Sequence, residues 1–218
     1  MDGMTREAFP DSMLRALCYT RAMSPIETLA VALGIACVYL IIRQNIWCWP
    51  IGIAMVTLYA WIFYDARLYS DAGLQVIYIG LQIYGWYYWL TGKAASEAQA
   101  PIIMLTARWR GTWATIAVAA TAALGFVMST YTDADLAYWD ATTTVLSLIA
   151  QALLSRKVLE NWLVWIAVDV LAIGIYSYKE LYLTAGLYAV FLGMASWGLL
   201  VWWRDWQDQR AAPASAGA

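Results

Sequence analysis

The sequence contains no histidine, and only 13% of its 218 residues are charged. Without histidine the chain lacks the usual proton shuttle near neutral pH and the commonest zinc ligand. Its three cysteines, Cys18, Cys37 and Cys48, form no C-x-x-C pair, so we expect packing residues and neither a metal nor a cofactor. The formal net charge of −2 and the lack of a long basic run argue against nucleic acid as a partner.

Hydrophobic residues make up 63% of the chain, whereas a typical soluble domain is about half apolar. A soluble domain of this size could not hide the excess, because small domains leave much of their surface in water. Seven segments are long and apolar enough to cross a bilayer as helices: 25–42, 44–64, 72–92, 111–132, 138–155, 160–178 and 181–203. The sequence therefore predicts an all-α integral membrane protein with seven transmembrane helices and the lipid bilayer as its solvent.

The ends of the chain differ from these segments. Residues 1–23 lack the features of a signal peptide, and residues 11–22 could form an interfacial helix. The first span opens with Ser24-Pro25-Ile26-Glu27, a capping box with proline at the first helical position, so Glu27 is interpreted as a cap. Residues 205–218 are expected to form a disordered tail.

The distribution of lysine and arginine predicts an orientation. With the N-terminus outside, the cytoplasmic segments hold Arg43, Lys93, Arg108, Arg110, Arg156, Lys157, Arg204 and Arg210. The outer loops then hold only Arg67 and Lys179, apart from the arginines of the N-terminal segment. Cytoplasmic loops carry an excess of these residues, so we expect the N-terminus outside and the C-terminus inside.

Two short windows recur along the chain. Asn45-x-x-x-Trp49 reappears as Asn161-x-x-x-Trp165, and Leu68-Tyr69-x-x-Ala72-Gly73-Leu74 reappears at 181–187. This predicts a three-helix unit over 24–92, a linker helix with loops over 93–137, and a second unit over 138–204. Both units would cross the bilayer in the same direction, a parallel 3+1+3 repeat of the kind that transporters use around a site at the midplane.

The sixth span carries Trp162, Trp165 and Asp169 on one helical face. A carboxylate at this depth costs roughly 2.5–3.5 kcal/mol, so it should face a cavity or a partner. Asp169 could balance a cationic substrate while the two indoles contact its ring, or it could form a structural hydrogen bond to a neighbouring helix.

The third span carries a polar and aromatic stripe, and the fifth span carries a further amide, Gln151, on the face of Asp140, Thr144 and Ser147. The stripe consists of Gln75, Tyr78, Gln82, Trp86 and Trp89. These amides could bind hydroxyl or carboxamide groups of a ligand, or they could hold helices together. In the second unit the glutamines are replaced by Tyr188 and Ala195, and the offset of the first window matches Asp169 with Ile53. The scaffold repeats while its polar groups do not, which suggests one asymmetric site.

Four motifs together resemble the Pnu family of bacterial vitamin transporters, in particular its nicotinamide riboside transporters. They are Trp47-x-Trp49-Pro50-Ile51-Gly52, Gln82-x-Tyr84-Gly85-Trp86-Tyr87-x-Trp89, Glu160-Asn161-Trp162-x-x-Trp165-x-x-x-Asp169 and Leu181-Tyr182-Leu183-Thr184. The resemblance covers residues 24–204. It implies a SWEET-like fold, facilitated diffusion of nicotinamide riboside across the inner membrane, and trapping of the substrate by phosphorylation inside the cell. It also implies substrate contacts from Gln82, Trp86, Asn161, Trp162, Trp165 and Asp169.

Alternatives remain open at this point. A sister group of the same family is proposed to carry thiamine, and both vitamins are small cationic aromatics. A membrane receptor that senses such a ligand is an interpretation of a different class. An enzyme is not expected, because no pair of carboxylates or metal cluster is found. The residues leave the oligomeric state open, including a homo-oligomer.

Overall fold

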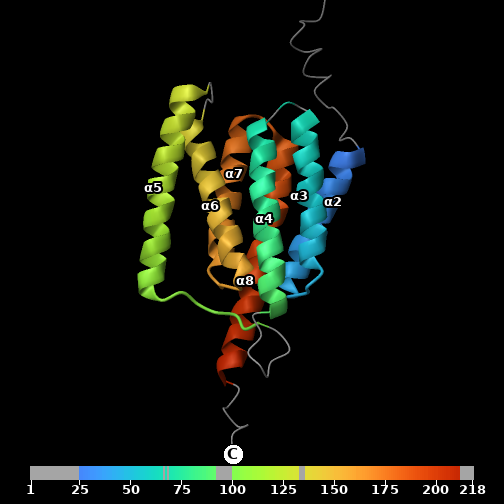
Figure 1. The fold of residues 1–218 in the computed structure, drawn as a ribbon, viewed down its shortest axis with the longest axis vertical. Coiled ribbons are helices and arrows are strands. Elements are labelled where there is room, and N and C mark those ends of the chain that lie inside the picture. The colour runs from blue at the N-terminus through green and yellow to red at the C-terminus, as the bar shows by residue number, and fades with distance from the viewer. Residues whose placement is uncertain (1–24, 66, 68, 92–99, 133–135, 212–218) are drawn as a thin grey trace, which may run out of the picture.

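The computed structural model describes residues 25–65, 67, 69–91, 100–132 and 136–211, and these form mainly long helices (Figure 1). The described helices are α2 (Pro25–Ile42), α3 (Cys48–Asp65), α4 (Tyr69–Thr91), α5 (Ala107–Tyr131), α6 (Ala137–Ser155), α7 (Asn161–Tyr178) and α8 (Tyr182–Ala211). Each overlaps one predicted span, so the predicted all-helical architecture is confirmed. The predicted interfacial helix at 11–22 lies outside the described residues.

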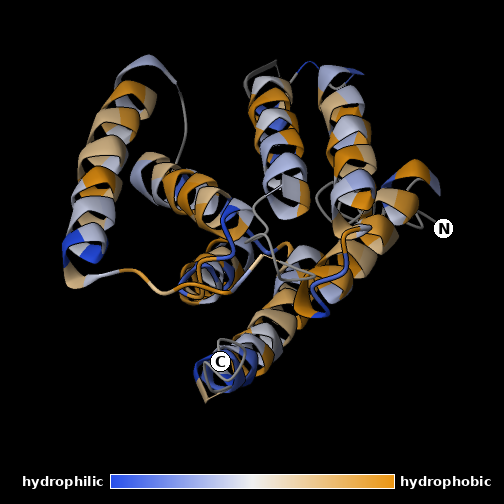
Figure 2. Cartoon of the chain, turned by 60° about the horizontal axis from the view of Figure 1, so that its bottom comes forward, coloured by the Kyte–Doolittle hydropathy of each residue, from blue (hydrophilic) through white to orange (hydrophobic). Residues whose placement is uncertain are grey.

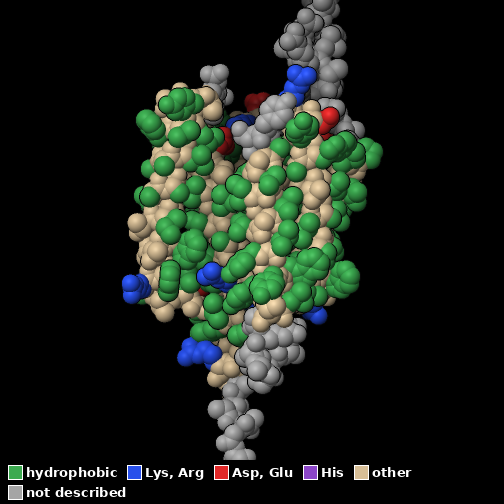
Figure 3. Space-filling model, viewed as in Figure 1, with side chains coloured by type: hydrophobic (Ala, Val, Ile, Leu, Met, Phe, Trp, Pro, Cys, Tyr) green, Lys and Arg blue, Asp and Glu red, His purple; other side chains and the backbone are tan. Residues whose placement is uncertain are grey.

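Five of these helices, α2, α3, α5, α7 and α8, are long and apolar enough to cross a membrane. The other two, α4 with 23 residues and α6 with 19, have the length, but their polar side chains lower their hydropathy. Much of the surface of the helices is made of hydrophobic residues (Figure 2). On the face shown in Figure 3, the charged side chains lie mainly near the two ends of the bundle. Helices that are hydrophobic all round are typical of membrane spans.

Six of the helices form a closed ring. In order around it, α2 packs on α3, α3 on α4, α4 on α6, α6 on α7, α7 on α8, and α8 on α2. Helix α5 packs against α6 and lies at the edge of the bundle (Figure 1). The two polar helices, α4 and α6, are therefore neighbours, and their seam joins the first three described helices to the last three.

Backbone features recur at one constant spacing, the 113 residues that separate Gln44 from Lys157. The helices α3 and α7 begin and end at positions this far apart. Of the described residues other than glycine, four have positive φ, and they form two such pairs, Gln44 (52°) with Lys157 (53°) and Arg67 (61°) with Glu180 (58°). Around the first pair the chain makes the same bonds twice, from Asn45 N to Leu40 O (2.9 Å) and from Val158 N to Leu153 O (3.0 Å). These are Schellman caps whose left-handed residue is not glycine.

Two predictions made from the sequence were wrong in detail. The offset of the first window, which matched Trp49 with Trp165, does not hold, because the common spacing pairs Trp49 with Trp162 and Val56 with Asp169. The tail does not begin at Asp205, because α8 continues to Ala211. The extra helical turns are held by contacts: Gln44 donates to the carboxylate of Asp205 (2.7 Å), and Arg210 lies over the ring of Trp206 (4.8 Å).

Candidate functional site

The seam between α4 and α6 is polar along its length. The hydroxyl of Tyr78 on α4 lies close to the side chain of Ser147 on α6. Two turns further along α6, the Ser155 hydroxyl oxygen lies 3.2 Å from the carbonyl oxygen of Leu81 and 2.9 Å from that of Gln151, so its single proton can be donated to either. The Gln151 side chain is buried, and its amide nitrogen has no hydrogen-bond partner among the described residues. A free buried donor of this kind is available to a ligand.

Gln82 lies on α4 with its side chain against α3. It is 6% exposed, and a Cβ added to Gly52 would come 2.5 Å from its amide nitrogen. Glycine at position 52 therefore provides the space into which this amide fits. The position in α7 that lies 113 residues after Gly52 holds Trp165. The helices α2–α4 and α6–α8, here called the first and second halves, therefore differ at this position by an entire indole ring.

Asp169 is the ninth residue of the 18-residue helix α7 and is only 4% exposed. Its carboxylate makes no hydrogen bond or ion pair to the described residues. Tyr188 of α8 lies close enough to interact electrostatically with Asp169 and with Tyr78. The Tyr188 ring also stacks on Tyr176, with 5.3 Å between ring centroids and 17° between planes. A buried carboxylate bordered by aromatic faces suits an organic cation.

Beyond this level the bundle is closed by four indoles, Trp49, Trp89, Trp162 and Trp202, here called the tryptophan plug. Trp49 meets Trp89 edge to face at 5.2 Å, and Trp162 meets Trp202 in the same way at 5.5 Å. Each pair sits against a glycine of the partner helix, Gly85 in the first half and Gly198 in the second. The plug thus consists of two copies of one packing unit, related by the common spacing of the backbone features.

The plug lies beside the turns at 43–47 and 156–160, at the end of the bundle from which the C-terminal part of α8 emerges (Figure 1). We call this the closed end. Asn161 is buried here, and its side-chain nitrogen donates to the carbonyl of Val158 (2.7 Å), while its side-chain oxygen has no partner among the described residues.

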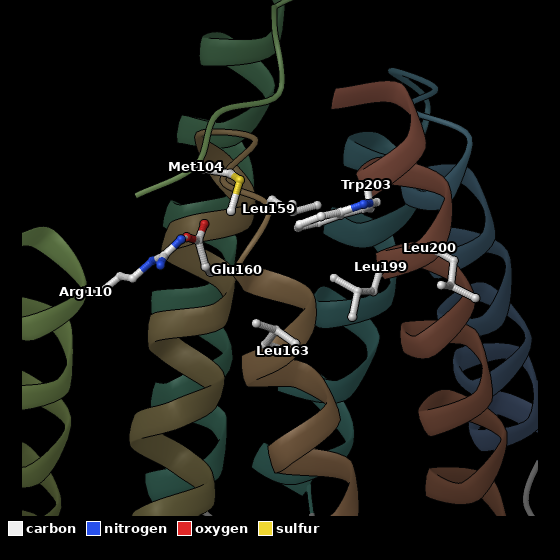
Figure 4. A pocket seen from close by; sticks show the side chains of 8 residues that line it. All are labelled: Met104, Arg110, Leu159, Glu160, Leu163, Leu199, Leu200 and Trp203. Carbon is white, nitrogen blue, oxygen red and sulfur yellow. The ribbon is translucent and has the colours of Figure 1, made fainter. Parts of the chain in front are cut away.

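A cavity of about 500 Å³ lies apart from this site, between α5, α7 and α8 (Figure 4). Its walls are apolar except for the ion pair between Arg110 and Glu160 (2.8 Å). Glu160 also accepts from the backbone N–H of Leu105 (3.1 Å), so the pair fastens the loop before α5 to the start of α7. The two charged side chains of this cavity therefore serve to hold the loop in place, and we do not count the cavity as part of the candidate site.

The predicted site residues therefore lie at two levels. Trp162 and Asn161 belong to the closed end, and Trp86 and Trp165 are half-buried against the same core cluster. The other predicted residues, Gln75, Tyr78, Gln82, Gln151 and Asp169, lie on α4, α6 and α7.

Sequence reasoning missed Tyr188, Tyr176 and Ser147 as site residues. For Tyr188 a signal was available, because it occupies the position that corresponds to Gln75 in the first half.

Comparisons with known proteins agree with this architecture. A family model described as nicotinamide mononucleotide transporter matches residues 24–204. The nicotinamide riboside transporter PnuC of Escherichia coli (strain K12) is 28% identical over 204 residues, which cover 83% of this chain and 85% of the relative. The riboflavin/roseoflavin transporter RibM of Streptomyces davaonensis is 26% identical over 189 residues, covering 85% and 87%. The crystal structure of the vitamin B3 transporter PnuC has the same fold, with a TM-score of 0.70 at 22% identity over 90% of this chain and 88% of that chain.

Proposed function

The chain belongs to the nicotinamide mononucleotide transporter family, and from this membership we propose that it carries nicotinamide riboside across the membrane by facilitated diffusion. The family resemblance expected from the sequence is thereby confirmed, and the protein is a multi-pass membrane protein. The observation that carries the choice of substrate is the buried, unpaired carboxylate of Asp169.

The distribution of charged residues in the ring of six helices favours nicotinamide riboside over the mononucleotide and over riboflavin, the ligands named for similar proteins. No lysine or arginine occurs in the sequence of α2, α3, α4, α6 or α7, and the first one in α8 is Arg204. A mononucleotide carries the same cationic ring but adds a phosphate, for which the transmembrane parts of these helices provide no lysine or arginine. Riboflavin is neutral and would leave the carboxylate unpaired. Nicotinamide riboside has a positively charged ring, and so does thiamine, which remains the second candidate.

In this proposal the pyridinium ring lies beside Trp165, with Asp169 balancing its charge. Gln82, Gln151, Gln75 and Tyr78 bond the ribose hydroxyls and the carboxamide. Trp86, Asn161 and Trp162 form the floor of the site above the closed end.

The recurrence of backbone features at one spacing supports a parallel 3+1+3 repeat like that of the SWEET proteins, with α5 as the linker. The basic side chains support a cytoplasmic closed end in the inner membrane, because Arg43, Arg108, Arg110, Arg156, Lys157, Arg204 and Arg210 lie on that side. Only Arg67 and Lys179 of the described basic residues lie at the other end.

The test is calorimetric titration of the purified protein in detergent with nicotinamide riboside, thiamine, riboflavin and the mononucleotide. We expect the riboside to bind most tightly, and Asp169→Asn to weaken it roughly tenfold or more, since bonds to charged groups contribute about 1.5–3 kcal/mol. Asp140→Asn is the matched control, because Asp140 pairs with Lys179 (3.5 Å) at the far end of α6. Unchanged riboside affinity in Asp169→Asn would contradict the charge argument.

A ligand-sensing receptor is the alternative from a different class. Uptake of radiolabelled riboside into vesicles separates the two, because a receptor binds its ligand without moving it. Saturable uptake supports a carrier, whereas binding without uptake supports the receptor.

A further inference from the structure

Lys157 is a buried cation at the closed end. Its side chain is 1% exposed, although it belongs to the short turn between α6 and α7. The ammonium donates one hydrogen bond, to the side-chain oxygen of Gln44 (3.1 Å), and lies 4.4 Å from the centre of the Trp89 ring. Of its three N–H groups, one thus has a described oxygen acceptor and another can face an aromatic ring.

The partner of Lys157 occupies the corresponding position in the other half. Gln44 and Lys157 each form the left-handed cap of their helix, at equivalent positions of the repeat. Their hydrogen bond therefore joins the two halves at their common position, directly beside the tryptophan plug. The amide nitrogen of Gln44 donates to Asp205 of α8 (2.7 Å), so the nearest carboxylate reaches the ammonium through an amide and not by direct contact.

The surroundings of Lys157 disfavour its charged form relative to water. Burial lowers the pKa of its ammonium to about 8, although the titratable groups that face it, Asp205 of α8 and Cys48 of α3, act in the opposite direction. The other neighbours, Gln44 and Trp89, do not titrate. A cation that is held away from water in this way recovers its hydration when it is exposed.

We propose that Lys157 is a positioning residue of the transport cycle, whose buried ammonium lies between the two halves at the closed end and biases that end towards opening. The closed end is held by aromatic packing and by hydrogen bonds between the halves, from Lys157 to Gln44, from Gln44 to Asp205 and from Trp202 to the carbonyl of Ile41. The lost hydration of the ammonium acts against these contacts. Opening exposes the cation to water and separates the halves around the plug. The inference rests on the proposed function only in that a carrier must open at this end to release its substrate.

The native thiol of Cys48 reports this opening without any substrate. It is 1% exposed, lies in the same core cluster as the plug, and can react with a water-soluble maleimide only when the closed end opens. The experiment uses the full chain in lipid nanodiscs with Cys18→Ala and Cys37→Ala, so that Cys48 is the single thiol. Labelling is measured at about 1 M salt, where the charges of Lys157 and Asp205, once exposed to water, no longer alter the reactivity of the thiol. The rate of labelling then follows the population of the open form.

We expect Lys157→Met to slow the labelling of Cys48 roughly tenfold or more. The methionine side chain has a similar length but no charge, so the closed form no longer loses the hydration of an ammonium. Asp205→Asn should accelerate labelling, roughly fivefold, because it removes the carboxylate that compensates the ammonium in the closed form. Arg156→Met is the matched control, since it removes an exposed cation from the same turn and should change the rate less than about twofold.

Opposite effects of Lys157→Met and Asp205→Asn support the proposal. Faster labelling in Lys157→Met overturns it, because the ammonium then stabilises the closed form, and unchanged labelling overturns it because the ammonium then has no effect on opening. If Lys157→Met does not fold, Lys157→Gln, which keeps a donor for the side-chain oxygen of Gln44 and removes the charge, decides in its place, and a faster or unchanged rate overturns the proposal. Because labelling needs no substrate, this outcome is independent of whether nicotinamide riboside is transported.

Discussion

The space at Gly52 provides a sharp test of the role of Gln82. In Gly52→Ala the new methyl group would lie 2.5 Å from the amide nitrogen of Gln82 and 2.9 Å from its carbonyl carbon and oxygen. The amide of Gln82 must then move away, because a contact this short between a methyl group and another heavy atom is not tolerated. If the amide bonds the substrate, the loss is about 1 kcal/mol, which is roughly a fivefold increase in Kd.

The assay is a double-mutant cycle of Gly52→Ala and Gln82→Ala, with Kd for nicotinamide riboside measured by calorimetry. Each single variant should weaken binding roughly fivefold. The double variant should be no weaker than either, because the methyl group fits into the space that the amide has left. Gly80→Ala is the matched control, since a Cβ at Gly80 meets nothing within 4 Å and the residue lies on the same helix as Gln82.

Two results would refute this reasoning. Wild-type affinity in Gly52→Ala would mean that the position of the Gln82 amide does not matter for binding. Additive losses in the double variant would mean that Gly52 and Gln82 act separately, for example through a general loosening of the contact between α3 and α4.

Further predictions concern stability and pH. Trp162→Ala should lower the free energy of unfolding by about 3 kcal/mol, whereas Trp61→Ala, at a side chain 54% exposed, should have little effect; thermal unfolding in detergent checks both. Glu160→Ala should cost about 1–3 kcal/mol because it leaves a backbone N–H of the loop before α5 unpaired, while Arg110→Ala, at a side chain 51% exposed, should cost less than about 1 kcal/mol in the same assay. The pKa of Lys157 is about 8 in the closed form and returns towards 10.5 when the side chain is exposed to water. Between about pH 8 and pH 10 the closed form therefore loses its proton first and becomes more stable relative to the open form. Transport should fall over this interval, because opening becomes less favourable. Lys157→Met should show no such fall, and a transport rate that rises over this interval would contradict the sign.

The sequence predicted the helices well because lipid imposes a simple requirement on length and polarity. The start of α2 was predicted correctly, because Pro25 takes the first helical position, which proline favours. The end of α8 could not be predicted in this way, because Asp205 and Arg210 look like solvated tail residues in the sequence. They remain helical because Asp205 accepts a hydrogen bond from Gln44 and Arg210 lies over the ring of Trp206. The contact between Asp205 and Gln44, which are 161 residues apart, is apparent only in the structure.

The candidate site was predictable in part, for a physical reason. Asp169 and Gln82 stand out because a polar group inside a membrane segment needs a purpose. The register of the repeat was predicted wrongly at the first window, because identical letters matched Trp49 with Trp165. The structure matches Trp49 with Trp162, since each of these indoles packs against a glycine of its neighbouring helix. Pairing by packing environment was not available from one sequence.

The asymmetry between the halves has a consequence for the direction of the electrostatic field. Asp169 and Lys157 both belong to the second half, and the corresponding positions of the first half hold the uncharged Val56 and Gln44. Along α7 the carboxylate lies about 12 Å from the helix start, where the turn that carries Lys157 is attached. A cationic substrate is therefore attracted to the middle of the bundle and repelled from the closed end for as long as the ammonium of Lys157 remains buried there. In the proposed cycle, opening of the closed end moves this ammonium into water, which screens the charge that opposes the passage of the substrate.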